Sequence, residues 1–303
     1  MAEPRIGDQL TLRSVDRRRP DGSAYRSLSS AIVQQLARDF DCSRRRVEQS
    51  ALEIGIIPER YIRNMASLSP EDQHRLLDCS VCVVGVGGLG GSVAEMLARI
   101  GVGRLRLVDG DRFEESNLNR QRFADTASLD KPKAQIAKEA IAVINPAVEV
   151  TALTEYLTTD NGPAIIGDAD IAIDCLDSLP ARLSLQTACR HKQIPMVSAA
   201  VAGVSGQITV FYPEDEGLAA LYGDLSAAAD RGAETTLGNL PFAVTMLASL
   251  ECSEAVKILL GRRQTLRGRL LIFDLTDLPE LDQLAIVPAA SISKLFAARV
   301  PPV

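Results

Sequence analysis

The chain has 303 residues, of which 46% are hydrophobic and 24% are charged, which fits one large or two ordinary globular domains. The net charge of −6 and the absence of tryptophan disfavour general binding to nucleic acid or to anionic membranes. The N-terminus lacks the apolar core of a signal peptide, and no apolar run reaches the roughly 20 residues that span a bilayer. We therefore expect a cytoplasmic protein.

The first 66 residues predict a lead-in and an extension. Residues 1–27 are polar and include three consecutive arginines, which is typical of a flexible segment. Residues 28–66 predict a helical extension, because two stretches carry apolar residues at helical spacing and Ser43 is a candidate N-cap of the second. The second stretch has helix-turn-helix-like spacing, so DNA binding is a minor alternative to packing on the following domain or on a dimer partner.

Residues 67–285 predict a single α/β domain. Short β-rich runs alternate with helical stretches, which indicates a Rossmann-like, doubly wound and mostly parallel sheet with later antiparallel strands. The expected strands are 82–86, 104–111, 148–157, 169–177, 195–203, 206–212 and 267–275. Residues 212–238 are expected to form a mobile crossover segment, and residues 286–303 a C-terminal tail with a short helix.

A glycine-rich loop follows the first strand of this domain. The run VVGVGGLGG contains Gly85, Gly87, Gly88 and Gly90 before a helical stretch. Glycines at this place let the backbone approach a phosphate, and the helix N-terminus supplies N–H donors. Asp109 ends the second strand about 20 residues later and can accept hydrogen bonds from a ribose. These features predict a nucleotide site without choosing between ATP and NAD.

The next segment favours a triphosphate over a dinucleotide. Arg120 can offer a planar, charged fork to phosphate oxygens, and Asn117 and Gln121 can orient phosphate or an attacking carboxylate. Lys133 begins the next helical stretch, where an ammonium can stabilise the α-phosphate during adenylyl transfer. Each residue alone is more often a solvated surface group, but their spacing after a glycine loop makes that interpretation weak.

These stretches resemble the signatures of the ThiF/MoeB/HesA family, bacterial relatives of the ubiquitin-activating enzymes. The resemblance runs from about Arg60 to Asp274 and rests first on SNLNRQ at residues 116–121 and KPK at residues 131–133. Further matching stretches are RYIRN (60–64), INP (144–146), DCLD (174–177), GQITVF (206–211) and EAVKILLG (254–261). The resemblance implies that the chain is an ATP-dependent adenylyltransferase.

The resemblance also implies residue roles. Arg120 and Lys133 would act on the phosphates, and Asp177 would help to place Mg²⁺ or the ATP phosphates. Arg63 would reach the phosphates of the other subunit's site as an arginine finger, although the family's RYxRQ is RYIRN here. The implied nucleotide-binding residues are Gly85, Gly87, Gly88, Gly90, Asp109, Asp111, Ser116, Asn117, Arg120, Gln121, Lys133 and Ser178.

The cysteines depart from the family. Many members hold a structural zinc with two CxxC pairs, but this chain has no cysteine between Cys189 and Cys252 and none after Cys252, so we expect no zinc site. Cys79 and Cys82 have CxxC spacing but enter a strand, and we interpret them as core residues. Residues 230–239 contain no thiol, so we expect the chemistry to stop at the acyl-adenylate.

The predicted substrate is a small ubiquitin-like sulfur-carrier protein ending in Gly-Gly, activated with Mg·ATP by a homodimer in a thiamine or molybdopterin-type pathway. The same chemistry on a tRNA base, a peptide or a small-molecule carboxylate is the first alternative, and the acidic charge makes RNA the weaker choice. An NAD-linked dehydrogenase explains the glycines and Asp109 but leaves SNLNRQ and KPK without a purpose. A DNA-binding regulator with a degenerate nucleotide fold is disfavoured by the intact Arg120, Lys133 and Asp177.

Overall fold

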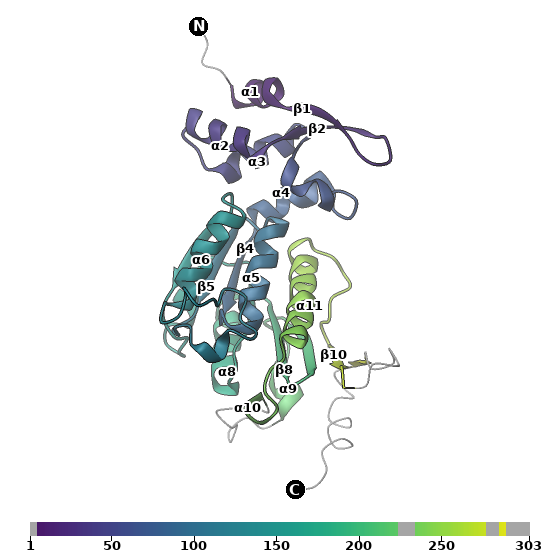
Figure 1. Ribbon diagram of the computed structural model, residues 1–303. Helices are drawn as coiled ribbons and strands as arrows, with labels where there is room; N and C mark the ends of the chain where they lie inside the picture. The colour runs from purple at the N-terminus through teal and green to yellow at the C-terminus, as the bar shows by residue number, and fades with distance from the viewer. Residues whose placement is uncertain (1–4, 224–233, 277–284, 289–303) are drawn as a thin grey trace.

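The computed structural model describes residues 5–223, 234–276 and 285–288 (Figure 1). Its centre is an eight-stranded sheet in the order β11-β10-β9-β8-β7-β4-β5-β6. The strands are β4 (Ser80–Val84), β5 (Arg104–Val108), β6 (Glu149–Leu153), β7 (Ile171–Asp174), β8 (Met196–Ala202), β9 (Ser205–Phe211), β10 (Arg269–Asp274) and β11 (Ala285–Pro288). The five strands from β4 to β8 are parallel, and β9, β10 and β11 each pair antiparallel. The predicted fold class is therefore confirmed.

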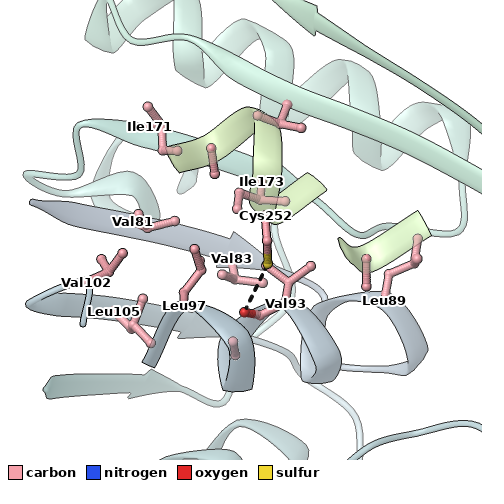
Figure 2. Close-up of a cluster of buried hydrophobic side chains, with 14 of the residues drawn as sticks. Val81, Val83, Leu89, Val93, Leu97, Val102, Leu105, Ile171, Ile173 and Cys252 are labelled. Atoms are coloured by element: carbon pink, nitrogen blue, oxygen red, sulfur yellow. Dashed lines mark hydrogen bonds between the residues drawn. The ribbon is translucent and has the colours of Figure 1, made fainter. Parts of the chain in front are cut away.

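Side chains alternate between the two faces along each strand, so both faces of the sheet present apolar residues. Helices cover both faces. In β4, Val81 and Val83 face the larger core cluster, which also contains residues of α5 (Gly88–Ile100), α6 (Lys133–Ile144) and α11 (Pro241–Leu259). Figure 2 shows this cluster, in which the Cys252 Sγ donates to the Val93 carbonyl oxygen at 3.6 Å. The opposite face packs against α7 (Gly162–Ile166) and α8 (Leu179–Lys192).

The two cysteines of the CxxC spacing lie on opposite faces of the sheet. Cys79 belongs to the larger cluster, whereas Cys82 is fully buried in the cluster under α7 and α8. Their interpretation as core residues is confirmed. Among the described residues, no group of three or more His, Cys, Asp and Glu side chains could hold a metal ion.

The N-terminal elements lie at one end of the molecule, at the top of Figure 1. They are α1 (Ile6–Arg13), β1 (Val15–Arg18), β2 (Ala24–Leu28), α2 (Ser30–Asp39), α3 (Arg44–Glu53), β3 (Ile56–Pro58) and the 3-10 helix η1 (Glu59–Asn64). β1 and β2 form an antiparallel hairpin, and β3 adds parallel to β2. As predicted, the Ser43 side chain caps α3 by accepting from the Arg46 N–H at 3.2 Å.

The flexible lead-in expected for residues 1–27 is wrong for the described residues 5–27. The sequence suggests flexibility because polar residues dominate, and in the structure every side chain of β1 is indeed exposed. Leu10 and Leu28, however, are buried with Val33, Leu36 and Val47 in a separate small core. The predicted helical extension also contains strand β3, which pairs with β2, so it is not purely helical.

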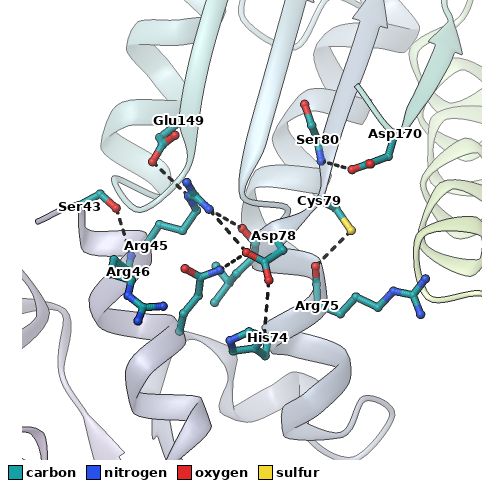
Figure 3. Close-up of polar contacts among 12 residues, drawn as sticks. Ser43, Arg45, Arg46, His74, Arg75, Asp78, Cys79, Ser80, Glu149 and Asp170 are labelled. Carbon is teal, nitrogen blue, oxygen red and sulfur yellow. Dashed lines mark hydrogen bonds and ion pairs between the residues drawn. The ribbon is translucent and has the colours of Figure 1, made fainter. Parts of the chain in front are cut away.

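Polar contacts connect these elements from Ile6 to Asn64, which we call the N-terminal unit, to the α/β domain. Arg45 Nε donates to Glu149 Oε1 at 3.1 Å, and its Nη1 donates to the Leu77 carbonyl oxygen at 3.3 Å (Figure 3). Deeper in the junction, the Tyr61 hydroxyl donates to Glu48 Oε2 and accepts from Asn145 Nδ2, both at 3.0 Å. The RYIRN and INP stretches therefore meet at this junction.

The crossover contains two short helices, α9 (Ala219–Tyr222) and α10 (Glu234–Leu237). Of the predicted mobile crossover (212–238), residues 224–233 lie outside the described residues. The predicted tail (286–303) is described only to residue 288, where it forms part of β11, and its predicted helix lies outside the described residues. Within the described residues, none of the helices has both the length and the apolar character needed to cross a bilayer.

Candidate active site

A cavity of about 390 Å³ opens where the parallel strands end. The chain runs from β4 to β5 and β6 on one side and then returns to β7 on the other side of β4. Ligands of doubly wound sheets bind at such a reversal of strand order. Nine of the predicted site residues line this cavity, namely Gly85, Gly87, Gly88, Asp109, Asp111, Arg120, Gln121, Lys133 and Asp177.

The four predicted glycines fall into two groups. Gly85 has φ +88°, and a Cβ there would lie 2.5 Å from the Cys175 carbonyl oxygen. A Cβ on Gly90 would lie 1.7 Å from the Gly85 carbonyl oxygen, and Gly90 does not line the cavity. Gly87 and Gly88 form the cavity wall at the start of α5. Gly85 and Gly90 therefore permit close packing of the backbone. A Cβ on Gly87 or Gly88 would approach cavity-lining side chains, those of Gln121 at 3.4 Å and Val244 at 3.1 Å, beside the N–H groups of α5.

Asp109 is held by two backbone donors. The Val86 N–H donates to Asp109 Oδ2 at 2.7 Å, and the Asp111 N–H donates to Asp109 Oδ1 at 2.8 Å. Burial raises the pKa of Asp109 despite these two hydrogen bonds. The glycine loop and the end of β5 are thus joined through one carboxylate.

Lys133 is buried and paired with an acid in the cavity. Its Nζ lies 3.0 Å from Asp111 Oδ2, and the Tyr156 hydroxyl donates to Asp111 Oδ1 at 2.7 Å. Burial alone would raise the pKa of Asp111, but the hydrogen bond from Tyr156 and the contact with Lys133 outweigh it, so the pKa lies below its usual value. Lys133 and Asp111 thus form an ion pair at the cavity wall.

Some residues of the SNLNRQ stretch line the cavity and others do not. Arg120 and Gln121 line it, and Gln121 Oε1 is buried without a hydrogen-bond partner among the described residues. Ser116 and Asn117 lie outside the lining. The Asn117 Oδ1 accepts from the Glu114 N–H at 3.1 Å, and Arg120 Nη1 donates to the Ser116 carbonyl oxygen at 3.0 Å. These two residues therefore shape the turn that carries Arg120.

Three other predictions have different outcomes. Asp177 lines the cavity and is exposed. Ser178 occupies the N-cap position of α8 without a side-chain cap hydrogen bond and is not part of the lining. Arg63 lies elsewhere, in a hollow of about 740 Å³ formed by the N-terminal unit. Within one chain, Arg63 is thus not brought to the nucleotide cavity.

Sequence reasoning missed several lining residues, of which Tyr156 and Arg182 are the most informative. Tyr156 follows β6, so the rule that ligands bind at the carboxyl ends of parallel strands could have found it. Arg182 lies one turn into α8 and is buried, and no local pattern distinguishes it from a surface arginine.

The residues present fit a nucleoside triphosphate with a divalent cation. Gly87 and Gly88 leave a cradle beside a helix N-terminus, and Arg120 and Lys133 supply cations for phosphate oxygens. Asp177 is an exposed carboxylate at the same cavity, and Mg²⁺ in nucleotide sites is held by one or two carboxylates and phosphate oxygens.

Comparison with known proteins finds similarity over most of this chain. The model of the ThiF family matches residues 61–290. The SAMP-activating enzyme E1 of Haloferax volcanii is 34% identical over 225 residues, covering 73% of this chain and 82% of that protein. The sulfur carrier protein ThiS adenylyltransferase of Escherichia coli is 33% identical over 218 residues, covering 71% and 86%.

A solved structure shows the same fold. Escherichia coli MccB with ATP superimposes with a TM-score of 0.59 at 20% identity, covering 75% of this chain and 69% of that chain. The family match spans most of the α/β domain, and the two enzymes above are each similar over more than two thirds of this chain. On this evidence the chain belongs to the ThiF family.

Proposed function

We propose that the protein adenylates the C-terminal carboxylate of a small ubiquitin-like sulfur-carrier protein that ends in Gly-Gly, using Mg·ATP. The observation that carries this proposal is the meeting of Arg120, Lys133 and Asp177 in one cavity at the N-terminus of α5. Cations beside a phosphate cradle suit adenylyl transfer, and the relatives named after sulfur carriers suggest the substrate. We propose a thiamine or molybdopterin-type pathway, as the resemblance to the ThiF/MoeB/HesA family implies.

The proposed reaction needs positioning and charge stabilisation. A carboxylate oxygen attacks the α-phosphorus of ATP, the bond from that phosphorus to the bridging oxygen breaks, and pyrophosphate leaves with the acyl-adenylate as the other product. Asp109 accepts from the ribose, Arg120 neutralises phosphate oxygens, and Lys133 stabilises charge that develops on the α-phosphate. Asp177 would hold Mg²⁺, which when bound would supply positive charge to the phosphate oxygens.

The reaction is proposed to stop at the acyl-adenylate. Cys175 is the cysteine that lines the cavity, and burial beside Glu251 and Asp174 raises its pKa well above the usual value. A thiol held in its protonated form is a poor nucleophile, so it is unsuited to take the acyl group as a thioester. Sulfur would then be delivered by another protein.

Arg63 is proposed to complete the site of a second subunit. It lies in the hollow of the N-terminal unit and not in the nucleotide cavity of its own chain. An arginine finger supplied across a homodimer would reconcile this place with a role on the phosphates.

ATP–pyrophosphate exchange tests the proposal. We expect exchange that requires Mg²⁺ and one carrier protein from a panel ending in Gly-Gly, including carriers of thiamine and molybdopterin pathways. Arg120→Ala should lower the exchange rate at least about 100-fold, because a charged contact to the transferring phosphates is lost. Arg99→Ala is the matched control, since Arg99 pairs with Glu95 on α5 outside the cavity.

The same assay separates the alternatives. ATP binding without exchange for any carrier would overturn the carrier assignment and direct the panel to peptides, tRNA and small-molecule carboxylates. Binding of NAD but not ATP would instead support a dehydrogenase.

A further inference from the structure

One buried guanidinium connects the loop after β7 to the neighbouring strand β8. Arg182 Nη1 donates to the Ala199 carbonyl oxygen at 2.7 Å and lies 3.3 Å from Asp174 Oδ2, and its Nη2 donates to the Leu176 carbonyl oxygen. Arg182 is 7% exposed and lines the nucleotide cavity. A single planar fork therefore fixes two carbonyl groups from different segments of the cavity wall.

Asp174 does not depend on Arg182 for its hydrogen bonds. The Ser198 hydroxyl donates to Asp174 Oδ2 at 2.7 Å, and the Leu176 N–H donates to Asp174 Oδ1 at 3.2 Å. Both carboxylate oxygens thus have other donors, so satisfying Asp174 does not by itself explain the two contacts of Arg182 with backbone carbonyls.

The contact with Leu176 bears directly on Asp177. The Leu176 carbonyl belongs to the peptide bond whose nitrogen is that of Asp177, and a peptide unit is planar. A hydrogen bond that orients this carbonyl therefore orients the backbone from which the Asp177 side chain projects. Asp177 is exposed and lines the same cavity. The orientation of its backbone therefore influences where its carboxylate points.

The charges around Arg182 limit which variant is informative. Burial, and then the charge of Asp174, raise the pKa of Glu251 well above its usual value, which favours its neutral form. Arg182 and Asp174 are thus the compensating charges of this interior, and removing one alone would leave a buried charge unpaired. Lysine keeps the charge but cannot reproduce the planar fork.

We propose that Arg182 is a positioning residue, which sets the Asp177 carboxylate for Mg²⁺ by orienting the peptide bond between Leu176 and Asp177. The inference rests on the role of Asp177 in the proposed function.

The first test measures nucleotide affinity by calorimetry with and without Mg²⁺. We expect Arg182→Lys to weaken binding of Mg·ATP about 10-fold and to change binding of Mg-free ATP less than about 2-fold. Arg190→Lys is the matched control, because Arg190 is also on α8 and donates to the Asp215 and Glu216 carbonyl oxygens outside the cavity. Equal weakening of both forms of ATP would overturn the proposal, since a merely structural defect does not discriminate between them.

A double-mutant cycle then asks whether Arg182 acts through Asp177. We expect Asp177→Asn with Arg182→Lys to bind Mg·ATP as Asp177→Asn alone does, because the second change has no carboxylate left to misplace. Multiplicative effects would contradict this route. If Asp177→Asn alone keeps the full preference for Mg·ATP, the positioning role also falls, whereas failure of the proposed reaction appears separately as lost pyrophosphate exchange in the unmodified protein. If Arg182→Lys does not fold, Asp174→Asn with Arg182→Met removes both buried charges and undergoes the same measurements.

Discussion

Asp111 Oδ2 lies 3.0 Å from Lys133 Nζ, so the lysine assigned to the α-phosphate has an anionic partner within the protein itself. The Tyr156 hydroxyl donates to the other oxygen of Asp111, and the Asp111 N–H donates to Asp109. These contacts connect the segment after β5, the segment after β6 and the first residue of α6 around the cavity. The position of Lys133 thus depends on a residue that lies 45 positions away from Asp111 in the sequence.

Tyr156→Phe is expected to weaken ATP binding about 2- to 10-fold, which corresponds to the roughly 0.5–1.5 kcal/mol of one ordinary hydrogen bond. The ring would remain against Gly110, so stability should stay unchanged. ATP affinity measured by calorimetry checks this. Tyr156→Ala, which removes the ring contact as well, should weaken binding further; equal affinities for Phe and wild type would show that the hydroxyl does not position Lys133.

Gly85→Ala should be far more destabilising than Gly55→Ala. Both glycines have positive φ, +88° and +76°, so alanine costs about 1–2 kcal/mol of conformational energy at each. At Gly85 the new Cβ also meets the Cys175 carbonyl oxygen at 2.5 Å, whereas no described atom lies within 4 Å at Gly55. Free energies of unfolding from denaturant titration should differ by at least about 2 kcal/mol. Similar values would mean that the loop relaxes and that the close approach is not required.

The α/β domain is predictable because its signals are local. Alternating strand and helix patterns, the glycine loop and the acid at the end of β5 each occupy a few consecutive residues, and nine of the predicted residues do meet in the cavity. Ser116 and Asn117 show the limit of a motif, because a stretch can match while some of its members shape a turn and do not line the cavity.

The missed features depend on contacts between distant segments. Arg182 becomes notable only when its fork is seen on the carbonyl groups of Leu176 and Ala199. The hairpin of β1 and β2 is largely exposed, and its composition indicates flexibility. Leu28, at the end of β2, nevertheless packs into the small N-terminal core. No spacing in one sequence places Arg63 relative to a second subunit.

Glu48 predicts a pH-dependent stability of the junction. Burial raises the pKa of Glu48 from 4.5 to about 7, against the opposing effects of Arg60 and Tyr61. The folded state therefore binds more protons than the unfolded state between these values, so stability falls as pH rises from about 4.5 to about 7. Glu48→Gln should match wild type near pH 4, below the unfolded pKa, and be more stable by about 3 kcal/mol at pH 8.

Denaturant unfolding at both pH values measures this difference. Glu149→Gln is the control, because Glu149 pairs with Arg45 at the same junction but is exposed. A gap between Glu48→Gln and wild type that does not change with pH would show that Glu48 stays charged in the folded protein.

The proposed arginine finger makes a quantitative prediction for mixed dimers. Arg63→Ala and Arg120→Ala homodimers should each be nearly inactive in pyrophosphate exchange. If Arg63 acts across the dimer, a mixed dimer holds one site with both arginines intact and one site with neither. Random mixing after reversible dissociation should therefore recover about a quarter of wild-type activity, since half of the dimers are mixed and each has one working site. If Arg63 acts within its own chain, neither site of a mixed dimer is complete and mixing restores nothing. Full activity of the Arg63→Ala homodimer would instead remove Arg63 from the mechanism and leave the hollow of the N-terminal unit as its place in the structure.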